Sequence, residues 1–151
     1  MSLDLDDLYQ QVILDHSKHP RNFHAIEAPT GRADGHNPLC GDRITVFLNV
    51  RSGRIEQAAF SGAGCAICLS SASIMTETLR GKTLAEAEAL FSRFHDMLTG
   101  QSDAASAALE LGKLGAFSGV LRFPIRVKCA TLPWHTLRAA MRGTNQVVST
   151  E

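Results

Sequence analysis

The sequence has neither an excess of charge of one sign nor a long apolar run. Its 151 residues include 15 basic and 15 acidic side chains, so the formal net charge is zero. Proteins that bind nucleic acid need a basic face for the phosphates, which argues against nucleic acid as a partner. The longest apolar run, Cys65 to Leu69, has five residues, whereas a membrane-spanning helix needs roughly 20. We therefore expect no nucleic-acid partner and no membrane partner.

Internal repeats, low-complexity tracts and linkers rich in proline and serine are absent as well. The first residues, MSLDLDDL, are acidic, whereas secretory and mitochondrial leaders are basic. A chain of this length buries roughly two-thirds of its unfolded surface, which suffices for a core without disulfides. We expect a cytoplasmic protein with a single domain over residues 1–143 and a C-terminal tail over residues 144–151.

Cysteine is scarce, and the four cysteines, at positions 40, 65, 68 and 129, are irregularly spaced. In a neutral cytosolic chain, cysteines are more typical of metal ligands or nucleophiles than of a disulfide framework. Only Cys65 and Cys68 have the CxxC spacing, so a zinc ribbon of paired CxxC motifs is excluded. Free cysteines are also commonly small buried hydrophobic residues, and the spacing alone leaves both interpretations open.

Alternation and turn signals predict strands in the first half of the chain. Residues 43–50 alternate apolar with polar side chains, residues 52–53 form a turn, and residues 54–61 are the antiparallel partner. A further short strand is expected over residues 30–35. Apolar residues at helical spacing predict an N-terminal helix that ends before Pro20.

Helical signals fill the second half. A first helix is expected from Cys65 to about Leu79, a second is opened by a capping box at Thr83–Glu86, and a third covers residues 102–111. A loop over residues 112–119 is expected to follow. After it we expect a short helix from Pro124 and a final helix that Thr131 caps, with Pro133 in its first turn. This order predicts an α+β fold. A small antiparallel sheet of about three strands packs against the helices, with an N-terminal helix and a helical C-terminal half.

Three cysteines lie in settings that favour chemistry. Cys40 stands in a turn directly before a strand, and Asp42 follows two residues later, so that a bend at Gly41 brings thiol and carboxylate together. Cys65 follows a Gly-x-Gly segment at the start of a helix, where free N–H groups and the helix dipole favour a thiolate.

Cys129 follows Arg126 and Lys128, whose positive charges also favour a thiolate. Three thiolates and one carboxylate suit a four-coordinate tetrahedral site for zinc or for the iron of a cluster. A metal or thiol site of this kind would have to be assembled by the fold from separate loops, and the interpretation of these cysteines as buried hydrophobic residues stays open beside it.

Other candidates have simpler explanations. Cys68 lies one helical turn after Cys65 among apolar residues and is expected to be a core thiol; a redox CxxC pair would need a thioredoxin-like βαβ pattern. His16 and His19 are expected to provide polar surface at the end of the first helix. His36 is the histidine nearest to Cys40 in the sequence.

The motifs Cys-Gly-Asp at 40–42, Gly-x-Gly-Cys at 62–65 and Lys-Cys at 128–129 occur in an informative order. With the segments around them, they resemble the U-type iron–sulfur scaffold family (IscU, the NifU N-terminal domain, SufU), over nearly the whole chain. The further matching segments are residues 8–16, 20–22, 37–39 and 70–73, Ala66-Ile67, Arg126-Val127 and Ala130-Thr131-Leu132.

Three features indicate the SufU-like branch. Scaffolds of the IscU type have histidine before the third cysteine, where this chain has Lys128. They also carry Leu-Pro-Pro-Val-Lys upstream, where residues 123–128 read Phe-Pro-Ile-Arg-Val-Lys. The helical insertion around residues 101–118 is SufU-like as well.

The resemblance implies a zinc ion bound by Cys40, Asp42, Cys65 and Cys129. It implies that the protein accepts persulfide sulfur from a PLP-dependent cysteine desulfurase of the SufS type and passes it to downstream cluster assembly proteins. In that mechanism a histidine of the desulfurase replaces Cys40 on zinc, and the freed Cys40 takes the sulfur. We hypothesise that Arg126 steadies the site or the anionic sulfur.

Two alternatives remain. The same cysteines would serve a scaffold on which a transient [2Fe–2S] cluster is assembled. A purely structural zinc domain is disfavoured, because structural sites are normally closed by four Cys or His ligands and Asp42 is neither.

Overall fold

The structure, a computed structural model, describes residues 5–143 and 147–149. Its helices are α1 (Leu5–Lys18), α2 (Ala66–Leu79), α3 (Leu84–Thr99), α4 (Ala104–Leu111), the 3-10 helix η1 (Gly112–Arg122) and α5 (Pro124–Arg142). Its strands are β1 (Gly31–Asn37), β2 (Asp42–Arg51), β3 (Arg54–Ala63) and β4 (Val148–Ser149).

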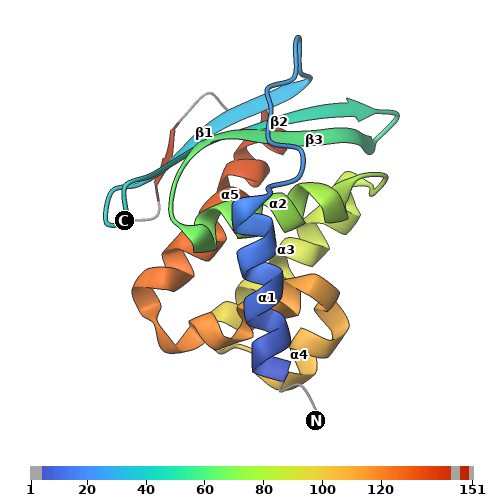
Figure 1. The fold of residues 1–151 in the computed structure, drawn as a ribbon. Helices are drawn as coiled ribbons and strands as arrows, with labels where there is room; N and C mark the ends of the chain where they lie inside the picture. Colours follow the sequence, from blue (N-terminus) through green and yellow to red (C-terminus); the bar gives the residue numbers. More distant parts are fainter. Residues whose placement is uncertain (1–4, 144–146, 150–151) are drawn as a thin grey trace.

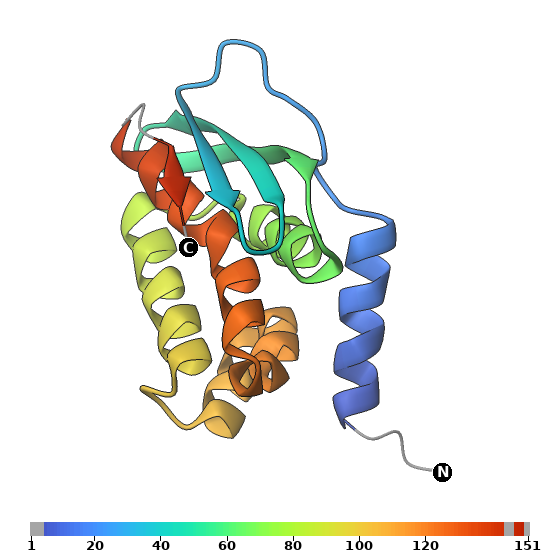
Figure 2. The same ribbon diagram turned by 90° about the vertical axis from the view of Figure 1, so that its left-hand side faces the viewer.

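The strands form one sheet in the order β3-β2-β1-β4, in which β1, β2 and β3 are antiparallel and β4 runs parallel to β1. The helices gather on one face of this sheet (Figure 1), and α2 and α5 are the helices that pack against it. Figure 2 shows α1 at the side of the molecule, where it packs on α2 and η1. The predicted α+β class is confirmed, and β4 is a short addition to the three expected strands.

Alternation of buried and more exposed side chains along the strands explains the inner face of the sheet. Ile44, Val46 and Leu48 of β2 are buried every second residue against the helices, as a strand with one buried face requires. On β1 the same face carries Gly35, because a Cβ there would collide with the hydroxyl of Thr136 on α5. The long last helix therefore lies close against the sheet.

The helical half is held by its caps and by an aromatic core. The predicted capping box is confirmed: Glu86 N–H donates to Thr83 Oγ1 (3.1 Å), and Thr83 N–H donates to Glu86 Oε1 (3.0 Å). Beneath it, the Phe94 ring lies 5.1 Å from Trp134 and 5.8 Å from Phe117, centroid to centroid. All three rings are fully buried, so this cluster ties α3, η1 and α5 together.

Two expected boundaries were wrong. The two helices expected around Thr131 are one continuous helix, α5, with Pro133 inside it. Pro133 has no N–H to donate to the Cys129 carbonyl, but the buried residues on both sides of it keep the helix in place. The stretch expected as a loop from residue 112 is η1. Its large buried side chains, Leu114, Phe117 and Val120, have a period of three that matches the 3-10 repeat, and Gly115 and Ala116 are buried between them.

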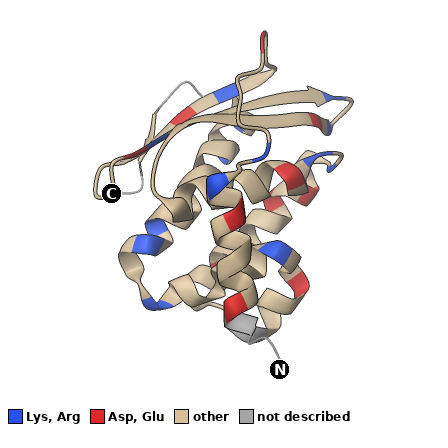
Figure 3. Ribbon diagram, in the orientation of Figure 1, with Lys and Arg blue, Asp and Glu red and all other residues tan. Residues whose placement is uncertain are grey.

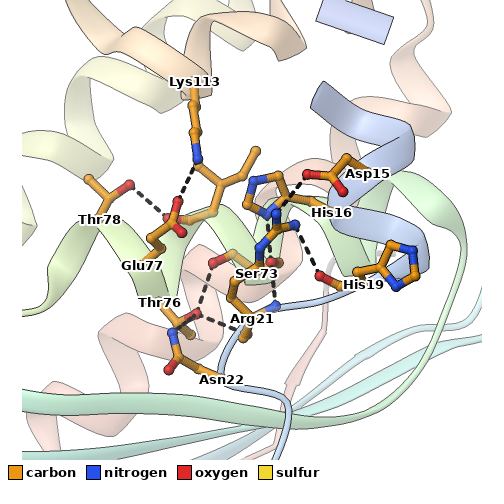
Figure 4. Close-up of polar contacts among 11 residues, drawn as sticks. Asp15, His16, His19, Arg21, Asn22, Ser73, Thr76, Glu77, Thr78 and Lys113 are labelled. Carbon is orange, nitrogen blue, oxygen red and sulfur yellow. Dashed lines mark hydrogen bonds and ion pairs between the residues drawn. The ribbon is translucent and has the colours of Figure 1, made fainter. Parts of the chain in front are cut away.

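The interpretation of His16 as surface was also wrong, whereas His19 is exposed as expected. His16 is buried under α2, with its Nδ1 2.7 Å from Ser73 Oγ. The same hydroxyl oxygen accepts the backbone N–H of Arg21 at 2.8 Å. Figure 4 shows these groups meeting where α1 ends. Burial is the main cause that lowers the pKa of His16 below its usual value, and the Arg21 charge lowers it further.

This buried imidazole predicts a pH dependence of stability. An unfolded chain takes up a proton at His16 as the pH falls through about 6.5, whereas the folded chain resists it. The contribution of His16 to the free energy of unfolding is therefore fully present above that pH and is lost as the pH falls below it. In urea unfolding of the metal-free, reduced protein, we expect the midpoint to fall between pH 7.5 and pH 5.5, and to fall less in His16→Gln. Equal losses in both proteins would contradict this assignment.

Charges of both signs are interspersed over the helices and the sheet (Figure 3), in line with the zero net charge. Within the described residues, no helix combines the length and apolarity needed to cross a bilayer. Of the expected tail, Val147 to Ser149 are described and include β4, whereas residues 144–146 and 150–151 lie outside the described part.

Candidate metal centre

The predicted site residues come from two connections at one end of the sheet and from helix α5. Cys40 lies in the turn between β1 and β2, and Asp42 is the first residue of β2. Cys65 is the N-cap of α2, directly after β3. Cys129 lies in the second turn of α5. All four cysteines are free thiols.

The structure brings three of these residues into one cluster. One ligand atom each from Cys40, Asp42 and Cys129 lies within 4.8 Å of the others. The Cys129 and Cys40 sulfur atoms are 3.1 Å apart. Asp42 and Cys129 are completely buried, whereas Cys40 is half-buried.

The Cys65 sulfur lies beside this cluster but is not part of the 4.8 Å group. Its backbone N–H donates to Oδ1 of Asp42 at 2.8 Å, which ties the start of α2 to the start of β2. Hydrogen bonding with Cys129 is the largest influence that lowers the pKa of Cys65, to about 6, and the N–H groups of Cys68 and Ile67 in the first turn of α2 contribute. The helix start thus favours the thiolate, as the sequence predicted.

Cys129 departs from that expectation. Hydrogen bonding with Cys65, followed by burial and by hydrogen bonding with Cys40, raises the pKa of Cys129. The positive charge of Arg126, which is exposed to water, does not outweigh these effects. These opposite shifts favour the thiolate at Cys65 and the protonated thiol at Cys129.

Two glycines allow the close approach of these elements. Gly62 has φ of +131°, and a Cβ there would collide with the Arg43 carbonyl of β2. A Cβ on Gly64 would lie 2.7 Å from Oδ1 of Asp42, the atom that accepts from Cys65. The buried carboxylate therefore requires glycine at position 64, whereas the β2 backbone and the positive φ require it at position 62.

The cluster opens to solvent through two adjoining cavities. A cavity of about 580 Å³ is lined by Cys40 and Cys65, and a second of about 480 Å³ lies between Cys65, η1 and α1. Arg122 and Arg126 line both. The negative charge of the Cys65 thiolate is the main cause that raises the pKa of Arg126. The start of α5 thus places the positive charge of Arg126 on the cavity that Cys40 and Cys65 line.

Two other candidates do not belong to the cluster. Cys68 is buried in the core, as predicted, and burial raises the pKa of its thiol. His36 pairs with Arg43 across the sheet and lines a separate cavity with Asp34 and Val147.

Asn37, which the sequence did not single out as a site residue, lies at the centre of the cluster. It is fully buried, and its Nδ2 donates to Oδ2 of Asp42 (3.3 Å) and to the Cys129 sulfur (3.5 Å). Among the described residues, its Oδ1 is the only buried side-chain oxygen or nitrogen without a hydrogen-bond partner. Such an unpaired carbonyl costs about 1–3 kcal/mol. Its position opposite Asp42 in a hairpin was the available sequence signal.

Comparison with known proteins identifies relatives of this arrangement. The chain matches the NifU-like N terminal domain over residues 8–140. It is 42% identical over 134 residues to the zinc-dependent sulfurtransferase SufU of Bacillus subtilis (strain 168), with 89% of each chain covered. It is 39% identical over 144 residues to the iron–sulfur cluster assembly scaffold protein IscU of Streptococcus pyogenes serotype M1, with 91% of this chain and 85% of that protein covered.

A solved structure has the same fold. It is the crystal structure of a proposed iron–sulfur cluster assembly scaffold protein for the SUF system from Fervidobacterium islandicum AW-1, with a TM-score of 0.81 and 33% identity. The similarity covers 91% of this chain and 99% of that one. The match to the domain and the identity to full-length relatives agree with the motifs, and the chain belongs to the family of the NifU-like N-terminal domain.

Proposed function

We propose that this protein is a zinc-containing sulfur acceptor in iron–sulfur cluster biogenesis. It takes persulfide sulfur from a PLP-dependent cysteine desulfurase of the SufS type and passes it to downstream cluster assembly proteins. The observation that carries the proposal is the cluster of Cys40, Asp42 and Cys129 beside Cys65, at the mouth of an open cavity. The similarity to a relative named as a zinc-dependent sulfurtransferase supports it.

The donor set fits zinc. Two sulfurs and a carboxylate oxygen already lie together, and a third sulfur, that of Cys65, adjoins them. Thiolates with one oxygen ligand satisfy the four-coordinate preference of this ion. We propose Cys40, Asp42, Cys65 and Cys129 as the ligands. Zinc, when bound, keeps the thiols deprotonated at neutral pH.

Cys40 is the proposed acceptor because it is half-buried and lies in a turn rather than in a helix or a helix cap. It lines the open cavity and lies in a turn before Gly41, which has φ of +70°. Cys65 is held by α2, and Cys129 is fully buried. The Cys40 thiolate attacks the terminal sulfur of the persulfide. A new S–S bond forms, the persulfide S–S bond breaks, and the desulfurase cysteine leaves as a thiolate with the electron pair.

Arg126 is proposed to support this step. It lines the same cavity as Cys40 and is exposed, so it offers a positive charge to the anionic sulfur as it arrives. Leu39, Phe123 and Ile125 form an exposed apolar rim around the opening. A rim of this kind is typical of a surface that another protein covers.

The proposed function predicts that the zinc-loaded protein stimulates a SufS-type cysteine desulfurase. Alanine release from cysteine is measured with the zinc-loaded protein, with the chelated protein and without either. We expect a large stimulation that requires zinc, because removal of the persulfide sulfur frees the desulfurase for another turnover. Equal turnover in all three reactions would overturn the proposal.

The scaffold function is the second candidate, and the similarity to IscU proteins favours it. The same thiols would hold the iron atoms of a [2Fe–2S] cluster as cargo. Lys128 before Cys129 removes one soft ligand that a histidine would offer. An absent stimulation, together with cluster absorbance when iron and sulfide are supplied, would establish the scaffold function instead.

A further inference from the structure

Asn37 is the last residue of β1 and stands directly opposite Asp42, the first residue of β2. Both side chains point to the helix-facing side of the sheet, and both are completely buried. A neutral amide is a poor zinc ligand compared with a thiolate or an imidazole. The burial of Asn37 within the cluster therefore needs an explanation other than ligation.

The hydrogen bonds of this side chain link two proposed ligands. Its Nδ2 donates to the Asp42 carboxylate at 3.3 Å and to the Cys129 sulfur at 3.5 Å. The other oxygen of Asp42 accepts the backbone N–H of Cys65 at 2.8 Å. Asn37, Asp42, Cys65 and Cys129 thus form one hydrogen-bonded frame across β1, β2, α2 and α5.

The orientation of the amide follows from its neighbours. An ionised carboxylate only accepts hydrogen bonds, so the NH₂ group must face Asp42. That orientation leaves Oδ1 of Asn37 buried with no donor, unlike any other buried side-chain oxygen or nitrogen in residues 5–143 and 147–149. Because Oδ1 of Asn37 stays buried without a donor, we infer that the two hydrogen bonds that Nδ2 donates contribute more to stability than the missing hydrogen bond to Oδ1 costs.

Cys40 lies outside the frame. The Asn37 side chain bonds to Asp42 and Cys129, whereas its backbone carbonyl only accepts the Cys40 N–H that closes the turn, at 3.3 Å. The amide therefore holds Asp42 and Cys129 and makes no bond to the Cys40 sulfur, whose contact with the frame is the Cys129 sulfur at 3.1 Å.

We propose that Asn37 is a positioning residue of the metal centre, which orients the Asp42 carboxylate and the Cys129 sulfur while Cys40 departs. The proposal rests on the proposed function in so far as these side chains bind zinc. Groups that hydrogen-bond to metal ligands fix the ligand orientation, and their loss typically costs roughly 10–100-fold in metal affinity.

The test compares Asn37→Ala and Asn37→Thr with the wild type and with Asn49→Ala. Threonine nearly preserves the side-chain volume but cannot reach both partners, and it suits a strand. Asn49 is a matched control, because its amide bonds Gln57 on an exposed part of the sheet. Circular dichroism establishes that each variant folds. Zinc affinity and release rate are measured by competition with a chelator, and the ligand field by the Co²⁺ absorption spectrum.

We expect both Asn37 variants to bind zinc about 10–100-fold more weakly, to release it faster and to show a shifted Co²⁺ spectrum. Asn49→Ala should match the wild type. If both Asn37 variants match the wild type in affinity, release and spectrum, the positioning role is overturned while the proposed function stands. Tight zinc binding without stimulation of a desulfurase would overturn the proposed function and leave the role of Asn37 intact. A wild type that binds no zinc would overturn both.

Discussion

Replacement of Cys40 by alanine is expected to reduce desulfurase turnover to the level of the desulfurase alone. Cys40 and Cys65 are both half-buried and line the larger cavity, but Cys65 is the N-cap of α2, and Cys129 is completely buried. No other thiol combines access to a partner with a position in a turn. Turnover is followed by alanine release, and the transferred sulfur by mass spectrometry of the peptide that carries residue 40.

Two control variants separate sulfur acceptance from loss of the metal. Asp42→Ala removes a proposed ligand but leaves the Cys40 thiol, so it is expected to weaken zinc binding and still become labelled with sulfur. Cys68→Ala removes a core thiol outside the cluster and is expected to keep both properties. If Cys40→Ala still accepts sulfur at the full rate, Cys65 or Cys129 is the acceptor.

Local sequence rules predicted most of the fold. Ile44, Val46 and Leu48 alternate clearly, and the Thr83–Glu86 box carries its own hydrogen bonds, so β2 and α3 follow from short-range chemistry. The glycines before Cys65 predicted the end of a strand and the start of a helix, and the structure has β3 ending at Ala63 and Cys65 as the N-cap of α2. In these segments local preference and tertiary packing agree.

The wrong predictions concern segments whose structure depends on tertiary packing rather than on local sequence. Proline usually marks the start or the end of a helix, but the buried residues on both sides of Pro133 keep α5 continuous across it. His16 looks like a polar helix end until α2 supplies Ser73 as its partner, 57 residues away along the chain. Asn37 contacts Cys129 over 92 residues. Local sequence patterns do not predict hydrogen bonds between residues so far apart in the chain. The hydrogen-bonded frame of the site was therefore visible only in the structure.

Gly64→Ala is expected to disturb the site without removing any of its polar groups. Its new Cβ would lie 2.7 Å from Oδ1 of Asp42, which is fully buried and bonded to the Cys65 N–H. Gly64 is not among the glycines with positive φ, so the strain comes from this contact. Overpacking of this kind costs about 1–3 kcal/mol. We expect that loss of unfolding free energy in urea titrations of the reduced, metal-free protein, together with weaker zinc binding.

Gly119→Ala is the matched control, because its Cβ would meet only the end of the flexible Arg122 side chain, at 3.6 Å. A double-mutant cycle then identifies the atom responsible. In an Asp42→Ala background the colliding carboxylate is absent, so Gly64→Ala should cost much less than it does alone. If the two losses of stability simply add, the residues act independently. The Gly-x-Gly segment would then serve the turn before α2 rather than the seat of the Asp42 carboxylate.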